Sequence, residues 1–105
     1  MSQTSFRAGS GDYQAVRPLV LTVTAIPGLS TSVETFTSSN ITTGAIGDLT
    51  TDSLCRAEFA SPTTYPGLTI VESAITATGT LQITFVNVTG STISPSSPQV
   101  NLLVF

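Results

Sequence analysis

Few side chains in this sequence could carry out chemistry, and the usual general bases are missing. The chain contains no His and no Lys, a single Cys, and six Asp or Glu residues, whereas Ser and Thr make up roughly a third of it. A Ser or Cys nucleophile needs a neighbouring base to take its proton, most often His or Lys. The sequence therefore predicts no catalytic residue, and we expect the protein not to be an enzyme.

The carboxylates do not suggest a metal or cofactor site. They are scattered through segments of different kinds, at Asp12, Glu34, Asp48, Asp52, Glu58 and Glu72. Asp48 and Asp52 are four residues apart, but they lack the glycine and the ligand spacing of a calcium loop. The glycine-rich residues 9–11 follow no expected strand and precede no expected helix, so they do not indicate a phosphate-binding loop. We expect no metal ion and no cofactor.

Charge and composition indicate association with protein. Arg7, Arg17 and Arg56 are the basic residues, and the net charge of -3 would repel a nucleic acid backbone. Only 9% of the residues are charged, and a surface with so little charge is more stable when other protein covers part of it. Cys55 is interpreted as a small buried hydrophobic residue. No segment is apolar and long enough to cross a membrane, so we expect synthesis and assembly in a cytoplasm.

Short β-branched segments separated by turn residues account for most of the chain. Leu81, Ile83 and Phe85 alternate with polar residues, which is typical of a half-buried strand, and Thr78-Gly79 before them predicts a hairpin. The expected strands are 19–26, 33–37, one within 49–59, 68–76, 81–85 and 100–105. We therefore expect one all-β domain over residues 19–105, a small antiparallel β-sandwich or barrel of about six to seven strands.

Residues 1–18 are expected to form an extended N-terminal arm. Its apolar residues Phe6, Tyr13 and Val16 are spaced apart, with Arg7 and Arg17 beside them, a composition suited to lying along a neighbouring subunit. These five residues are the candidate contacts with a partner protein. The alternative interpretation is a disordered tail, which is common for polar termini.

The last expected strand is apolar on both faces. Leu102, Leu103, Val104 and Phe105 are consecutive, so their side chains leave both sides of the sheet that they join. One side can meet the domain core, and the other needs cover from a second copy or from another protein. These four residues are the candidate self-association site. The alternative is that a second sheet or the loop around Tyr65 covers that other side.

The segment Thr80-Leu81-Gln82-Ile83-Thr84-Phe85-Val86-Asn87-Val88-Thr89-Gly90, followed by Thr92-Ile93-Ser94-Pro95, resembles a recurring segment in small virion proteins of tailed bacteriophages. The similarity extends loosely to residues 33–37 and 67–70. It implies a capsid decoration, or cement, protein that sits on the outside of the phage head, commonly as homotrimers. The partners implied are the chain itself and the major capsid protein, and the implied location is the virion.

A carbohydrate-binding or receptor-binding β-sandwich from a phage fibre or tail is the alternative function. Such sites stack sugar rings on exposed aromatic side chains. The chain has no Trp, and Tyr13 and Tyr65 are the candidate platforms. The sequence therefore favours the capsid decoration protein.

Overall fold

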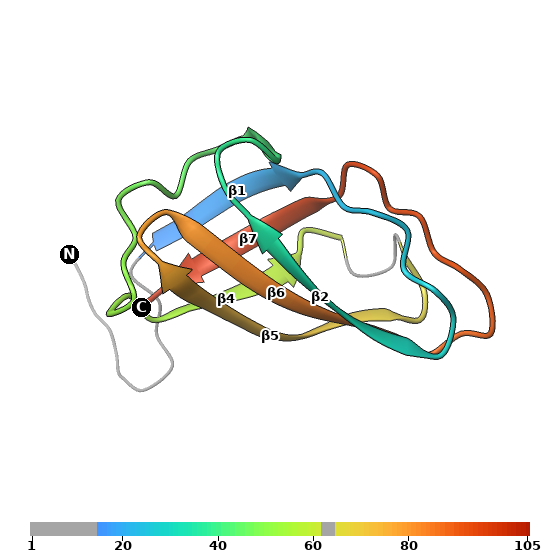
Figure 1. Ribbon diagram of the computed structural model, residues 1–105. Helices are drawn as coiled ribbons and strands as arrows, with labels where there is room; N and C mark the ends of the chain where they lie inside the picture. Colours follow the sequence, from blue (N-terminus) through green and yellow to red (C-terminus); the bar gives the residue numbers. More distant parts are fainter. Residues whose placement is uncertain (1–14, 62–64) are drawn as a thin grey trace.

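Seven strands form two antiparallel sheets that pack face to face (Figure 1). The computed structural model describes residues 15–61 and 65–105, and these residues contain no helix. Sheet A has the order β3-β1-β7-β4 and sheet B the order β2-β6-β5. The strands are β1 (Ala15–Leu21), β2 (Ser30–Phe36), β3 (Ile41–Thr43), β4 (Cys55–Phe59), β5 (Leu68–Ala77), β6 (Thr80–Asn87) and β7 (Gln99–Val104). The predicted all-β antiparallel domain is confirmed.

β6 is the central strand of sheet B, and its sequence explains why. Its even-numbered positions from Thr80 to Val86 are half-buried, whereas Leu81, Ile83 and Phe85 between them are fully buried. This alternation buries one complete face of the strand against sheet A. Gly79, with a φ of 73°, turns the chain directly from β5 into β6, so the predicted hairpin is present.

β1 begins earlier than the sequence indicates. Ala15 pairs with Val104 of β7, four residues before the expected start of the domain at residue 19. Pro18 is tolerated within the strand because the short β3 pairs only with Val20 and Leu21, so that β1 has a partner on one side at Pro18. Residues 15–18, expected in the arm, therefore belong to sheet A.

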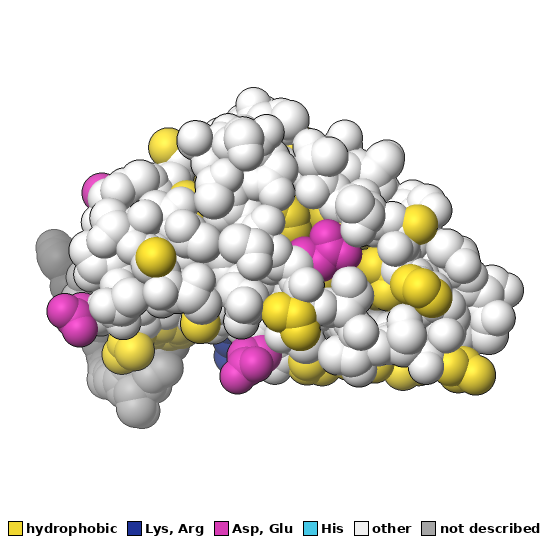
Figure 2. All heavy atoms as spheres, in the orientation of Figure 1, with side chains coloured by type: hydrophobic (Ala, Val, Ile, Leu, Met, Phe, Trp, Pro, Cys, Tyr) yellow, Lys and Arg dark blue, Asp and Glu magenta, His cyan; other side chains and the backbone are white. Residues whose placement is uncertain are grey.

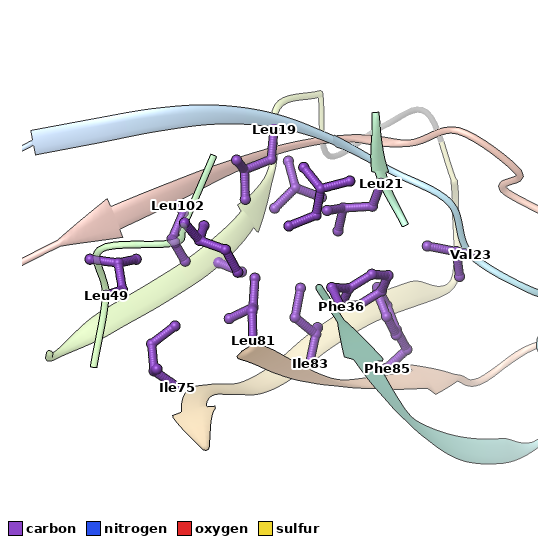
Figure 3. Close-up of a cluster of buried hydrophobic side chains, with 14 of the residues drawn as sticks. Leu19, Leu21, Val23, Phe36, Leu49, Ile75, Leu81, Ile83, Phe85 and Leu102 are labelled. Atoms are coloured by element: carbon purple, nitrogen blue, oxygen red, sulfur yellow. The ribbon is translucent and has the colours of Figure 1, made fainter. Parts of the chain in front are cut away.

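The core lies between the two sheets, where side chains from both layers point toward one another (Figure 3). Leu19 and Leu21 of β1 and Leu102 of β7 meet Leu81 and Ile83 of β6 there. The rings of Phe36 and Phe85 pack edge to face with their centroids 6.5 Å apart. Such aromatic pairs contribute about 0.5–1.5 kcal/mol beyond the area that they bury.

Asn87 is the buried polar side chain of the described core, and it ties one end of the sandwich together. Its Nδ2 donates to the carbonyl oxygens of Ile26, Pro27 and Ser91 at 2.9–3.1 Å. Its Oδ1 accepts from the backbone N–H and the hydroxyl of Thr89. The side chain therefore links the turn after β6 to the connection between β1 and β2 and leaves no polar atom of Asn87 without a partner.

Candidate interaction surfaces

The strand proposed for self-association, β7, lies inside sheet A. It hydrogen-bonds to β1 on one side and to β4 on the other, so neither backbone edge is free to pair with a second copy. Leu102 is fully buried in the core, and Val104 packs against the same cluster. Sheet B covers this face of β7, so Leu102 and Val104 are the residues through which the strand meets the core.

Leu103 and Phe105 do not share the core-facing side of β7 with Leu102 and Val104. Leu103 pairs with Val16 and with Arg56, so the three side chains lie in a row on the outer face of sheet A. Leu103 is 9% exposed and Val16 is 40% exposed. Phe105 follows β7, and its backbone N–H donates to the carbonyl oxygen of Leu54 at 2.9 Å.

Of the five predicted arm contacts, two lie among the described residues. Phe6, Arg7 and Tyr13 lie outside them, whereas Val16 and Arg17 are in β1. The guanidinium of Arg17 donates to both carboxylate oxygens of Asp48, at 2.6 and 2.8 Å, and to the carbonyl oxygen of Ala45. Arg17 is thus occupied within its own domain, and it fastens the loop before β4 to β1.

The same contact changes the acidity of Asp48. The hydrogen bonds from Arg17, helped by a backbone hydrogen bond and the positive charge, lower the pKa of Asp48 to about 2. The pairing also raises the pKa of the Arg17 guanidinium. Because both groups lie at the surface, the pair adds little to stability, and its main effect is to fix the position of the loop.

A groove that sequence reasoning missed runs between the edge strands of the two sheets. We call it the β4–β5 groove; it has a volume of about 870 Å³ and is lined by Cys55–Phe59, residues 68–73 and Phe105. β4 ends sheet A and β5 ends sheet B, so each strand has a ladder partner on one side. The alternation of apolar and polar residues in a strand does not determine which strands lie beside it. No local pattern in the sequence could therefore have revealed the groove.

One side-chain hydrogen bond joins the two strands beside the groove. Ser73 Oγ of β5 accepts from the backbone N–H of Ala57 in β4 at 2.8 Å. The bond satisfies an amide that the free edge of β4 would otherwise expose. A bulge between Ile70 and Glu72 changes the register of β5, which restores Ser73 to the core-facing side and leaves Val71 57% exposed.

Charged and aliphatic groups are both present in the β4–β5 groove. Arg56 pairs with Glu58 at 2.5 Å, and Glu72 contributes a second carboxylate. Cys55 is half-buried at one end of the groove, and burial raises the pKa of its thiol. Cys55 was expected to be a small buried hydrophobic residue. In the structure it is half-buried, and part of it lines the groove.

The rest of the surface is largely uncharged. Figure 2 shows one face of the molecule, on which hydroxyl, amide and backbone atoms predominate and charged groups are few. Large apolar side chains are also exposed on the domain, at Leu29, Leu54, Val88, Val33, Val71 and Val16.

Leu29 is the most exposed of these, at 77%, and it has an unusual backbone conformation. Its φ is 53°, the left-handed region that a Leu side chain rarely adopts. The backbone N–H of Leu29 donates to the carbonyl oxygen of Thr89, the residue after Val88, and Val88 is itself 63% exposed. We call Leu29 and Val88 together the apolar tip.

Tyr65 is engaged inside the domain. Its ring lies 5.6 Å from the ring of Phe59, and its hydroxyl donates to the carbonyl oxygen of Pro95 at 3.3 Å. The ring is therefore poorly placed to stack a sugar from solvent. The other aromatic platform considered for a carbohydrate site, Tyr13, lies outside the described residues.

No cluster of His, Cys, Asp and Glu suited to a metal ion occurs in residues 15–61 and 65–105. The same residues include no helix long and apolar enough to span a membrane. Comparisons of the chain with models of protein families, with curated proteins and with solved structures found no match.

Proposed function

We propose that the protein is a structural subunit of a phage particle, a capsid decoration or cement protein that binds the outside of the head and ties neighbouring capsomers together. The observation that supports this most is the surface: few charges and several exposed aliphatic side chains on a small sandwich with a satisfied core. A surface of this composition favours burial against other protein. The sequence resemblance supplies the particular setting, the virion, and the trimer as the expected oligomer.

The apolar tip is the contact that we assign to this function among the described residues. Leu29 combines a left-handed backbone conformation with a side chain that is 77% exposed, so the domain itself buries little of that side chain. Contact with another protein would bury both Leu29 and Val88. Burying an exposed Leu side chain completely contributes about 1.5–3 kcal/mol, so even a small apolar patch can anchor a subunit.

Two measurements test the proposed function. Native mass spectrometry of the purified protein gives its oligomeric state, and co-sedimentation with undecorated phage heads gives its attachment. The proposal expects a homo-oligomer, with a trimer most consistent with the resemblance, and saturable binding to the heads. A monomer that does not sediment with heads at any concentration would contradict it.

The contact surface is tested with a matched pair of variants. Leu29→Asn removes the exposed apolar group at the tip, whereas Leu54→Asn removes a similarly exposed one, 71%, from a different part of the surface. We expect Leu29→Asn to weaken attachment about tenfold or more and Leu54→Asn to leave it nearly unchanged. Equal effects of the two substitutions would remove the tip from the proposal.

A further inference from the structure

We propose that the outer edge of β2 pairs with the same edge of a second copy, so that two three-stranded B sheets join into one continuous antiparallel sheet. β2 is the outermost strand of sheet B on the side away from β5 (Figure 1). The contact has two-fold symmetry, so it uses the same groups of both copies and closes after two. Two copies can pair in this way without a phage head, so the inference does not depend on the proposed function.

Alternate residues of β2 direct their backbone groups away from β6. Asn40, in the turn after β2, shows which residues these are: its Nδ2 donates to the carbonyl oxygen of Thr35, and its Oδ1 accepts from the N–H of Thr37. Residues two apart in a strand point their backbone groups the same way, so those of Thr31 and Val33 also point outward. Within the described part of the chain, the N–H and C=O groups of Thr31 and Val33 have no hydrogen-bond partner. We call these groups the β2 edge.

The other sheet edges carry features that discourage pairing, whereas the β2 edge does not. β3 is three residues long, and in β4 the outward N–H of Ala57 is bonded to Ser73. β5 has a bulge beside Glu72. Short strands, occupied edges, bulges, Pro and Lys all hinder the addition of another strand. β2 pairs with β6 over its seven residues without a bulge and contains neither Pro nor Lys, so its edge is open to another strand.

The β2 edge allows one register for a second copy. With the two-fold axis at Ser32, Thr31 of each copy lies opposite Val33 of the other, and the N–H and C=O groups of both residues are all hydrogen-bonded. An axis at Val33 would instead require the carbonyl oxygen of Thr35, which is already bonded. An axis at Glu34 would place two carboxylates directly opposite each other, which is destabilising.

The side chains of β2 fit a second copy in this register. The exposed Val33 of one copy packs beside the methyl group of Thr31 of the other, which buries apolar surface on both. Glu34 lies opposite the uncharged Ser30 and keeps the hydrogen bond from Ser32 of its own chain. The two Glu34 carboxylates are four residues apart along the strands, about 14 Å, which exceeds the screening length of about 8 Å at physiological salt. The pairing therefore brings no like charges together.

A disulfide at the axis tests this register in the full-length protein. Residue 32 would face itself in a non-hydrogen-bonded pair, with Cα atoms about 4.5 Å apart, and a disulfide needs about 4.4–6.8 Å. In a Cys55→Ala background, Ser32→Cys should link two copies under mild oxidation, as measured on non-reducing gels. Ser30→Cys is the matched control, because the two copies of residue 30 lie about 14 Å apart, and it should link copies at least about tenfold more slowly. Equal rates, or no link through residue 32, would overturn the proposal.

The backbone contact is tested with a second pair of variants. Val33→Pro removes an outward N–H and leaves the ladder with β6 intact, whereas Val33→Thr keeps the N–H. We expect sedimentation velocity to show dimers that Val33→Pro weakens at least about tenfold and Val33→Thr less than about threefold. Circular dichroism checks that both variants fold. Equal dimerisation of the two variants, a wild-type protein that stays monomeric, or an edge that binds only unrelated peptides would overturn the proposal. None of these results would decide attachment to phage heads, which co-sedimentation measures separately.

Discussion

At the scale of single residues, Asn87 does more for this fold than its polarity suggests. In the sequence, Asn87 is one residue of the segment that resembles phage virion proteins, whereas the structure buries it completely with every polar atom bonded. Hydrophobic alternation in β6 predicts a buried residue at position 87, and an Asn there could have been recognised as a buried hydrogen-bonding centre. Its partners at residues 26 and 27 could not, because they are some sixty residues away along the chain.

Replacing Asn87 should destabilise the domain severely. Asn87→Ala removes five hydrogen bonds at a buried position and deletes the acceptor for the Thr89 amide, whereas the carbonyl oxygens of residues 26, 27 and 91 each keep a second donor. We expect a loss of about 2–4 kcal/mol in the free energy of unfolding. Urea denaturation followed by fluorescence or circular dichroism measures it. Asn101→Ala, at a half-buried position of β7, is the control and should cost less than about 1 kcal/mol. Similar losses for the two variants would contradict the role of Asn87.

Replacing Leu29, unlike replacing Asn87, should not destabilise the domain. Asn tolerates the left-handed conformation better than Leu, so Leu29→Asn should leave the free energy of unfolding unchanged or raise it by up to about 1 kcal/mol. The same urea experiment checks this. Combined with weakened attachment to phage heads, that result would separate a contact residue from a folding residue. A clear loss of stability would mean that the Leu29 side chain has a structural partner.

Asp48 should titrate at unusually low pH. Its pKa in the folded protein is about 2, below the ordinary value near 3.9, so its contribution to stability is present above about pH 4 and is lost as the pH falls through 2. An NMR titration of the carboxyl carbon measures the pKa directly. Arg17→Gln should return it to the ordinary range, because the hydrogen bonds from Arg17 are the largest cause of the shift. A pKa unchanged by that substitution would contradict the pairing.

At the scale of strands, the sequence predicted which segments are extended but not which of them are neighbours. The expected strands at 68–76, 81–85 and 100–105 correspond closely to β5, β6 and β7, since each is a clear β-branched or alternating run. β3 was missed because it is three residues long and lies among turn residues. The central position of β7 was missed because an apolar run on two faces indicates burial without indicating what lies at the two hydrogen-bonding edges.

The edge strands β4 and β5 depend on one side-chain contact, which can be removed. Ser73→Ala deletes the acceptor for the Ala57 amide and should cost about 0.5–1.5 kcal/mol. We expect the exchange of the Ala57 amide with deuterium to accelerate and the Cys55 thiol, whose pKa burial raises, to react faster with iodoacetamide. Unchanged exchange at Ala57 would show that something other than Ser73 protects this edge.

At the scale of the whole molecule, low charge should govern how the protein associates. Attachment that depends on aliphatic side chains rather than on ion pairs responds weakly to salt. We expect the affinity for phage heads to change less than about threefold between 50 mM and 500 mM NaCl. Co-sedimentation across this range measures it. A steep loss of binding with salt would move the contact from the apolar tip to the few charged groups.

The pairing of β1 with β7 has a consequence for how the chain folds as it leaves the ribosome. Ala15 and Val104 are partners at opposite ends of the sequence, so sheet A gains its centre only when the last strand has been synthesised. Sheet B lies wholly within residues 30–87 and is available earlier. Until β7 emerges, the apolar face formed by Leu81, Ile83 and Phe85 lacks the sheet that covers it. During that interval the nascent protein is most exposed to aggregation and most in need of a chaperone.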